Sequence, residues 1–308
     1  MDLKQLEYFV HVAELGSFTR ASGFLRVAQP ALSRQIRSLE VELRQSLFER
    51  NGRGVTLTEA GKRLLAHGRG ILQQVDRARQ DMEDQRGVAS GHLTVGLPPS
   101  VSRALTAPLV KAFRQRFPKA TLTVVEGLST YMLEWLQIGR IDCAVVYNVT
   151  PSATIDLMPV LDEALYVVSA RQPGQALTGP PLALASLADL ELVMPSRPHS
   201  LRMLLETALI AEGRRPHVGI EIESVAAILD LVQHQGLHGV LTLNGVLSHG
   251  PEAAFHVREI GPPRLVTTQW IATSAQRPTG PLIEQSTELL RELMLEHWSV
   301  PASLPLNG

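Results

Sequence analysis

The stretch VAQPALSRQIRSLE, residues 27–40, decides the fold of the first part of the chain. Its apolar side chains, with one from the next turn, recur at helical spacing: Leu32, Ile36, Leu39 and Leu43. A proline inside a helix costs about 3 kcal/mol, but at the first helical position its missing N–H is no loss. Pro30 therefore predicts where this helix starts, with Ala28 and Gln29 leading into it, and so fixes which side chains face outwards.

The opposite face of this helix is polar, and we expect it to be exposed: Gln29, Ser33, Arg34 and Arg37. Arg can form two hydrogen bonds with guanine and Gln two with adenine in the major groove of DNA, each pair worth roughly 1–3 kcal/mol of discrimination. The alternative is an ordinary solvated face, because charged residues are common on exposed helix surfaces. Taken alone, the helix leaves both interpretations open.

The segment before it favours DNA recognition. A helical periodicity from Leu3 to Ala13 ends at Gly16, and Ser17 is placed to cap a short second helix, FTRASGFL. This short helix and the helix in residues 27–40, joined by a tight turn, form a helix-turn-helix. In that motif the second helix enters the major groove, and its first turns reach the base edges.

The segment after it predicts a wing. LFERNGRGVTL, residues 47–57, contains two short strand-like runs around Asn51-Gly52, a favoured hairpin turn. A hairpin here places Arg50 and Arg53 beside the recognition helix, within reach of phosphates or the minor groove. The N-terminal part is therefore predicted to be a winged helix-turn-helix.

A long helix over roughly 58–87, capped by Thr58, is expected next. One of its faces has heptad spacing: Leu64, Gly68, Ile71, Val75, Ala78 and Met82. Gly68 interrupts this apolar seam, weakens the helix by roughly 1 kcal/mol against Ala, and would let a partner backbone come close. A helix of this length without a core of its own predicts a homodimer.

The remaining residues, 91–308, alternate strand-like and helical segments in two successive sets, which predicts an α/β domain with mostly parallel sheets. We expect lobe I at about 91–161 and 266–308 and lobe II at about 162–265, joined by two crossover strands. The cleft between such lobes is the usual place for a small ligand.

Hydroxyl residues stand at the predicted helix starts that face this cleft. Helix N-termini favour anions because their first N–H groups are free, and Arg197 adds a positive charge near one of them. We predict a small organic anion such as a carboxylate, although plain N-caps are the alternative for each hydroxyl. The candidate effector-binding residues are Ser100, Ser102, Ser129, Thr130, Tyr147, Ser196 and Arg197.

Composition narrows the function classes. The 308 residues are 44% hydrophobic and 19% charged, which is ordinary for a globular protein. The net charge of −1 divides into about +3 for residues 1–90 and −4 for residues 91–308, so the first part of the chain is mildly basic and the second mildly acidic. No apolar run is long enough to span a bilayer, and the N-terminus does not read as a signal peptide, so we expect a cytoplasmic protein.

The chemistry-bearing residues do not suggest an enzyme. Cys143, the single cysteine, lies in an apolar strand-like run and is interpreted as a small buried hydrophobe rather than a nucleophile. The sequence has no GxSxG, P-loop, GxGxxG or HExxH motif, so no catalytic residue, metal or cofactor is expected. Residues 91–308, taken alone, are also compatible with a solute-binding protein.

Several of these segments, in their order and spacing, resemble the LysR-type transcriptional regulators: LEYFVHVAELGSFTRAS, VAQPALSRQIRSLE, LFERNGRGVTLTEAG, GHLTVGLPPS and LSTYMLEWLQIGRIDCAVVY. The resemblance implies a winged helix-turn-helix at 1–58, a dimerising linker helix at 59–90 and a two-lobed effector domain like periplasmic binding proteins at 91–308. It implies double-stranded DNA, a small-molecule effector, RNA polymerase and other copies of the chain, as homodimer or homotetramer, as partners. By the resemblance, the DNA contacts fall on Gln29, Pro30, Ser33, Arg34 and Arg37, with Arg53 in the wing.

The sequence departs from the family pattern in two places. Ser22-Gly23 stands in the second helix where good helix formers are usual, and an interior Gly costs up to about 1 kcal/mol against Ala. In GLHGVLTLN, Leu237 replaces a glycine and Asn244 replaces a proline. The effector, the target genes and the sign of regulation stay open.

Overall fold

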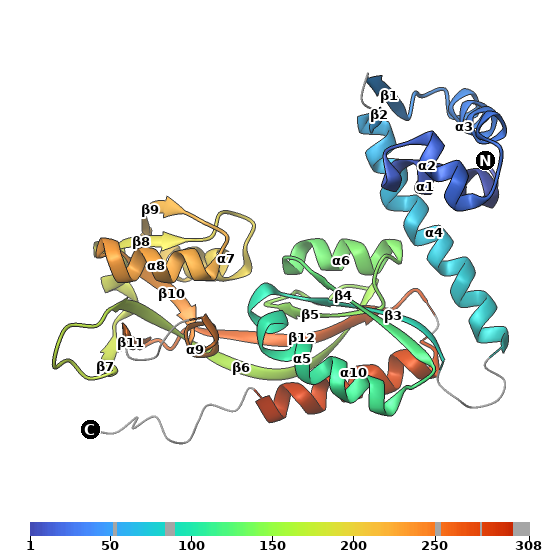
Figure 1. Cartoon of the computed structure of the whole chain (residues 1–308). Helices are drawn as coiled ribbons and strands as arrows, with labels where there is room; N and C mark the ends of the chain where they lie inside the picture. The colour runs from blue at the N-terminus through green and yellow to red at the C-terminus, as the bar shows by residue number, and fades with distance from the viewer. Residues whose placement is uncertain (52–53, 84–89, 250–253, 278, 298–308) are drawn as a thin grey trace. The chain divides into compact units, whose positions relative to one another are not determined.

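The computed structural model (Figure 1) describes residues 1–51, 54–83, 90–249, 254–277 and 279–297. The chain divides into two compact units, the first made of Met1–Gly91 with Gln137–Arg140 and the second of His92–Leu136 with Ile141–Gly308. No helix in the described part of the chain is both long enough and apolar enough to cross a membrane.

The first unit is a helix-turn-helix with a hairpin and a long helix. Its elements are α1 (Leu3–Leu15), α2 (Phe18–Leu25), α3 (Gln29–Leu43), β1 (Phe48–Asn51), β2 (Gly54–Leu57) and α4 (Glu59–Glu83). Asp2 and Gln5 form a capping box at the start of α1, and Gly16 ends that helix in the left-handed conformation, with φ of 61°. Ser17 accepts a hydrogen bond from the Arg20 N–H at 3.3 Å, so the predicted cap of α2 is confirmed.

The buried stripe of α3 is confirmed. Leu32, Ile36 and Leu39 are at most 2% exposed and pack with Phe9 and Ala21 of α1 and α2. The helix begins one residue earlier than predicted, at Gln29, because the Ala28 carbonyl already accepts hydrogen bonds from the Ala31 and Leu32 N–H groups, at 2.9 and 3.1 Å. Pro30 therefore occupies the second helical position, where its missing N–H is equally unneeded.

The hairpin differs from the prediction by one residue. Asn51 pairs with Gly54, so the two-residue connection is Gly52-Arg53, which lies outside the described residues, rather than Asn51-Gly52. The second strand is held against α1, since the Val55 N–H donates to the Gly16 carbonyl at 3.2 Å. Gly54 has φ of 147°, and a Cβ there would lie 2.8 Å from the Gly16 oxygen, so only glycine fits this contact.

The start of α4 has a packing partner within its own chain, which corrects the expectation of a helix without a core. Leu64, Leu65 and Leu72 pack on the core of the first unit. Gly68 is buried against α1, where an added Cβ would lie 3.1 Å from side-chain atoms of Leu6 and Val10. The close backbone approach that Gly68 allows is therefore to α1 of the same chain.

The second unit is a mixed α/β structure built on two long strands. Its elements are β3 (Gly91–Leu97), α5 (Pro99–Arg116), β4 (Ala120–Glu126), α6 (Ser129–Ile138), β5 (Cys143–Tyr147), β6 (Ile155–Ala170), β7 (Thr178–Leu182), a 3₁₀ helix (Leu184–Asp189), β8 (Glu191–Met194), α7 (Ser200–Ala211), β9 (His217–Glu221), α8 (Val225–Gln235), β10 (His238–Thr242), α9 (Leu243–His249), β11 (Phe255–Ile260), β12 (Val266–Ser274) and α10 (Pro281–His297). The strand order is β4-β3-β5-β12-β6-β10-β8-β9, with β11 also on β6 and β7 on β11.

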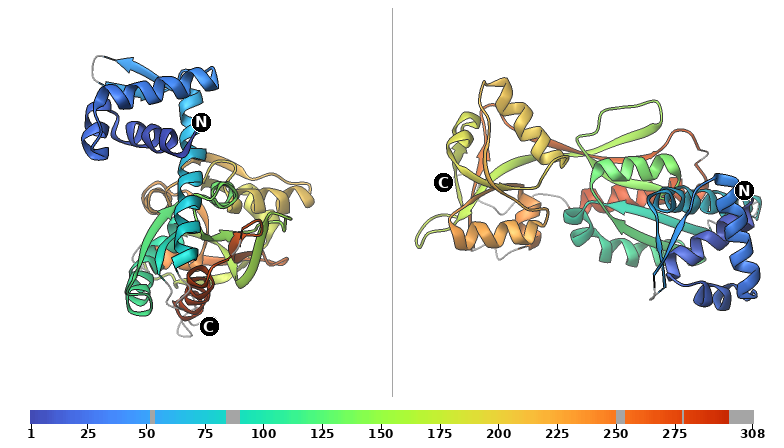
Figure 2. Two further views of the ribbon diagram at one scale, coloured as in Figure 1. Left: turned by 90° about the vertical axis from the view of Figure 1, so that its right-hand side faces the viewer. Right: turned by 90° about the horizontal axis from the view of Figure 1, so that it is seen from above.

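Strand β6 joins the two lobes of this unit, as Figure 2 shows from above. Its first part, to Ala164, pairs with β12, and its second part, from Leu165, pairs with β10 and β11. In the first lobe, α6 lies on one side of the sheet and α5 and α10 lie together on the other (Figure 1). In the second lobe, Val168 faces the core under α8 and α9, while Val167 faces the core under α7.

Two glycines give opposite predictions for the stability of the first unit. Gly23→Ala should raise its unfolding free energy by roughly 0.5–1 kcal/mol, because Gly23 is exposed inside α2 and an added Cβ meets nothing within 4 Å.

Gly61→Ala should lower the unfolding free energy of the first unit by about 1–3 kcal/mol, because a Cβ there overlaps the backbone oxygen of Leu47. Hydrogen–deuterium exchange of the α1–α3 amides measures both, and faster exchange in Gly23→Ala would contradict the conformation of α2.

Candidate functional site

The first candidate site is the exposed face of α3, formed by Gln29, Pro30, Ser33, Arg34 and Arg37. All but Ser33, which is half-buried, are exposed. Within the part of the chain that the structure describes, neither the Arg34 nor the Arg37 guanidinium forms an ion pair with an acidic side chain. The structure therefore brings together these predicted residues on one free, cationic surface. Arg53 lies outside the described residues, and Arg50 belongs to β1 but its side chain is not described.

This face is held at a fixed angle to the hairpin by one carboxylate. Glu40 of α3 accepts hydrogen bonds from the Leu47 and Phe48 N–H groups, at 2.8 and 3.3 Å, where the chain enters β1. Phe48 then packs its ring against Phe9 at 5.3 Å between centroids. The orientation of α3 relative to β1 thus depends on specific contacts rather than on loop length.

The second candidate site is a cavity of about 100 Å³ in the second unit, which we call the head cavity. The starts of α5, α6, α7 and α8 surround it through Ser100, Ser129, Ser200 and Val225, and Thr242 at the end of β10 closes it. First-turn N–H groups have no partner inside their own helix, and the helix dipole places partial positive charge there. Four helix N-termini therefore point their positive ends at one small space.

Tyr147, at the end of β5, connects the hydroxyls of the head cavity. Its hydroxyl lies 3.4 Å from the Ser100 Oγ, and its N–H donates to the Ser129 Oγ at 2.9 Å. Burial raises the pKa of the Tyr147 phenol far above its ordinary value, and the negative charge of Glu163 raises it further. Tyr147 is therefore a neutral phenol that can both donate and accept a hydrogen bond.

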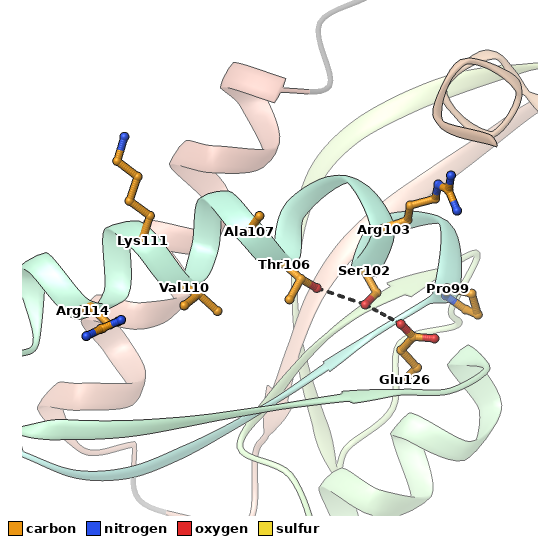
Figure 3. A pocket seen from close by; sticks show the side chains of 9 residues that line it. All are labelled: Pro99, Ser102, Arg103, Thr106, Ala107, Val110, Lys111, Arg114 and Glu126. Carbon is orange, nitrogen blue, oxygen red and sulfur yellow. Dashed lines mark hydrogen bonds between the residues drawn. The ribbon is translucent and has the colours of Figure 1, made fainter. Parts of the chain in front are cut away.

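Ser102 and Thr130 do not line the head cavity, although both were expected in the cleft. Ser102 follows Ser100 by two residues, about 200° around a helix, so the two face opposite sides. The Ser102 Oγ donates to Glu126 at 2.7 Å and lies 3.0 Å from the Thr106 hydroxyl, on an outer groove of α5 that also carries Arg103, Lys111 and Arg114 (Figure 3). Thr130 lines an adjoining groove described below.

Ser196 and Arg197 support the head cavity from outside. The Ser196 N–H and hydroxyl both donate to Glu223, which does line the cavity. Arg197 is two-thirds exposed and pairs with the buried Glu206 at 2.9 Å, a carboxylate that also pairs with Arg202. The lining residues in the described part of the chain include no Lys or Arg side chain.

Sequence reasoning did not select His199 and Glu223, two ionisable residues of the lining. His199 caps α7, because its Nδ1 accepts the Leu201 N–H at 3.3 Å. Burial lowers the His199 pKa, which the nearby Glu223 opposes. Both residues directly precede a predicted helix start, and this position was the signal that would have found them.

Comparisons with known proteins agree with this architecture. Residues 3–62 match the family described as "Bacterial regulatory helix-turn-helix protein, lysR family", and residues 86–295 match "LysR substrate binding domain". The nitrogen assimilation regulatory protein nac of Klebsiella aerogenes is 31% identical over 296 residues, covering 96% of this chain and 95% of that protein. The HTH-type transcriptional regulator BbuR of Bordetella bronchiseptica is 32% identical over 247 residues, covering 80% and 75%.

Solved structures show the same fold. CbnR, a LysR family transcriptional regulator, superposes with a TM-score of 0.69 at 22% identity, over 95% of this chain and 99% of that one. Full-length CbnR complexed with its target DNA gives a TM-score of 0.55 at 24% identity, with the same coverage. A full-length OxyR variant from Pseudomonas aeruginosa gives 0.68 at 24% identity, over 96% and 94%.

A buried polar contact links the lobes near the head cavity. Glu163 of β6 is 8% exposed and accepts hydrogen bonds from Asn244 of α9, at 2.7 Å, and from Gln269 of β12. Asn244 belongs to the second lobe, whereas this part of β12 pairs with β5 in the first. Asn244, which departs from the family pattern, therefore donates to a buried carboxylate at the crossover.

Asn244→Ala should lower the free energy of unfolding by roughly 1–3 kcal/mol, because a buried carboxylate loses a donor. Denaturant unfolding followed by tryptophan fluorescence measures the loss. In a Glu163→Ala background the same substitution should cost much less, since the acceptor is gone. An equal cost in both backgrounds would contradict the link.

Proposed function

The chain belongs to the family of LysR-type transcriptional regulators, and from this premise we propose that it reads a specific DNA site with α3 and responds to a small organic anion bound between its lobes. The family consists of DNA-binding regulators with a C-terminal effector-binding domain, not of enzymes. The proposal adds the residues that do each task and the chemical class of the effector.

We divide the chain into a DNA-binding domain at 1–58, a linker helix at 59–90 and an effector domain at 91–308. Ile71 of α4 is 38% exposed although its neighbour Leu72 packs on the core, and Val75 and Ala78 continue the heptad spacing from Ile71. This stripe supports a homodimer or homotetramer. Such an assembly acts on DNA in the cytoplasm, with RNA polymerase as a partner.

The observation that carries DNA reading is the pair of unpaired guanidiniums on a face of α3 whose rotation is fixed. Arg34 and Arg37 are exposed because Leu32, Ile36 and Leu39 are buried on the other side. Such arginines supply phosphate affinity that falls with salt, and base contacts that supply specificity.

The observation that carries anion binding is the convergence of four helix N-termini on the head cavity, whose one described carboxylate, Glu223, is bound by the Ser196 N–H and hydroxyl. A small anion there would accept hydrogen bonds from first-turn N–H groups and from the Ser100, Ser129 and Tyr147 hydroxyls. If the anion binds one spacing of the lobes better than another, it shifts the population towards that state.

Arg34→Ala should weaken binding to the preferred site by about 5- to 150-fold, the equivalent of roughly 1–3 kcal/mol for a lost bidentate base contact. Fluorescence anisotropy with a duplex selected by the wild-type protein from a random pool measures the change. Base preference at one position of the site should relax at the same time.

Arg215→Ala is the matched control, because it removes one exposed positive charge from a loop of the effector unit. Its affinity should stay within twofold of the wild type. Unchanged affinity and base preference in Arg34→Ala would show that α3 does not read the site.

Small carboxylates should raise the melting temperature of the full chain in a dose-dependent way. At a concentration of 100 times the Kd, the free energy of unfolding should rise by about 2.7 kcal/mol. Matched amides and amines should not raise the melting temperature, because helix N-termini select negative charge. Ser100→Val removes a lining hydroxyl and should weaken carboxylate binding about tenfold, so the same rise in melting temperature should need about ten times more ligand. Stabilisation by amines but not by carboxylates would overturn the anionic assignment.

A further inference from the structure

The head cavity is too small to enclose a whole effector. Its volume is about 100 Å³, below the 150 Å³ of an engineered protein cavity that holds one benzene molecule. Ligand pockets ordinarily measure about 300–1,000 Å³. A bound molecule must therefore place only a head group there and extend the rest of its atoms elsewhere.

A groove of about 590 Å³, which we call the arm groove, continues directly from the head cavity. The two share Ser129, Tyr147 and Ser200, so an occupant of one touches the walls of the other. The arm groove runs between the start of α6, the residues after β5 and the exposed side of α7. Its volume falls within the ordinary range for ligand pockets, whereas the volume of the head cavity falls below that range.

The described lining of the arm groove carries no charged side chain and is part apolar and part polar, with Asn148, Ser129 and Ser200 among its polar residues. Leu133 of α6, Val149 after β5, and Met203 and Leu204 of α7 supply the apolar surface. Thr130, Thr150 and Thr207 add hydroxyls, and no Asp, Glu, Lys, Arg or His is among the described lining residues. Met203 is 43% exposed, so its side chain is accessible to a molecule that lies in the groove.

We propose that the effector is a monocarboxylic acid whose carboxylate occupies the head cavity and whose uncharged, apolar arm lies in the arm groove along α7. This inference rests on the proposed function, because it assumes that the head group is an anion. It adds that the second half of the ligand carries no charge: the described lining of the arm groove offers a second carboxylate no cation and, unlike the head cavity, no convergence of four helix N-termini.

Chain length is the direct test. Isothermal titration calorimetry of the full-length protein with butanoate, hexanoate, octanoate and decanoate, all below their critical micelle concentrations, should show roughly three- to fourfold tighter binding per added methylene. That ratio corresponds to about 0.8 kcal/mol for each buried CH₂. Dicarboxylates of six, eight and ten carbons should bind at least tenfold more weakly than the matched monocarboxylates.

Met203→Lys tests the site itself. A cation at this groove wall should weaken octanoate about tenfold and strengthen the eight-carbon dicarboxylate by a similar factor, which a merely unfolded variant would not do. Ile210→Lys is the matched control: it makes the same change on the same helix at a residue that is 59% exposed and does not line the groove. Both affinities should be unchanged in that control.

The outcomes separate the two proposals. If short and long monocarboxylates bind equally, or if dicarboxylates bind as well as monocarboxylates, the arm groove is not used and only this inference falls. If no carboxylate binds while the protein still binds its selected DNA duplex, the anionic effector falls and this inference falls with it. A reversal of preference confined to Met203→Lys supports both.

Discussion

The rotation of each helix about its own axis, fixed by its buried apolar stripe, is the constraint on which both sites depend. In α3, burial of Leu32, Ile36 and Leu39 leaves Arg34 and Arg37 no direction but outwards. In α7, burial of Leu205 and Leu209 has the same effect and turns Met203 towards solvent beside the arm groove. Because side chains three and four residues apart share a face, one buried stripe determines both the core and the functional surface.

The same constraint explains how much the sequence could predict. The apolar stripe of α3, the cap at Ser17 and the alternation of strands and helices are local signals, so those elements are where the sequence puts them. Ser100 and Ser102 show the limit. Both belong to one helix start, and only the packing of α5 decides that Ser100 faces the head cavity while Ser102 faces Glu126.

Long-range contacts account for the remaining differences. Arg197 was expected to charge the cleft, but it pairs with Glu206 of α7, nine residues further along the chain, which also pairs with Arg202. Gly68 interrupts a heptad pattern that suggested a partner chain, yet the space it leaves is filled by Leu6 and Val10 of α1. Neither contact follows from periodicity: the first depends on the path of the loop before α7, and the second on where α1 packs.

Tyr147 is where the proposed ligand site and the lobe crossover meet. Its N–H is bound by Ser129 and its hydroxyl lies beside Ser100, while its ring is a wall of both the head cavity and the arm groove. Glu163 accepts hydrogen bonds from Asn244 of the second lobe and from Gln269 of β12. Its negative charge also raises the pKa of the Tyr147 phenol. A ligand that displaced the Tyr147 hydroxyl from Ser100 would therefore act close to the Glu163 contact that links the lobes. Only a difference in those contacts between two lobe spacings can couple binding to a change of state, because a ligand with equal affinity for both would shift nothing.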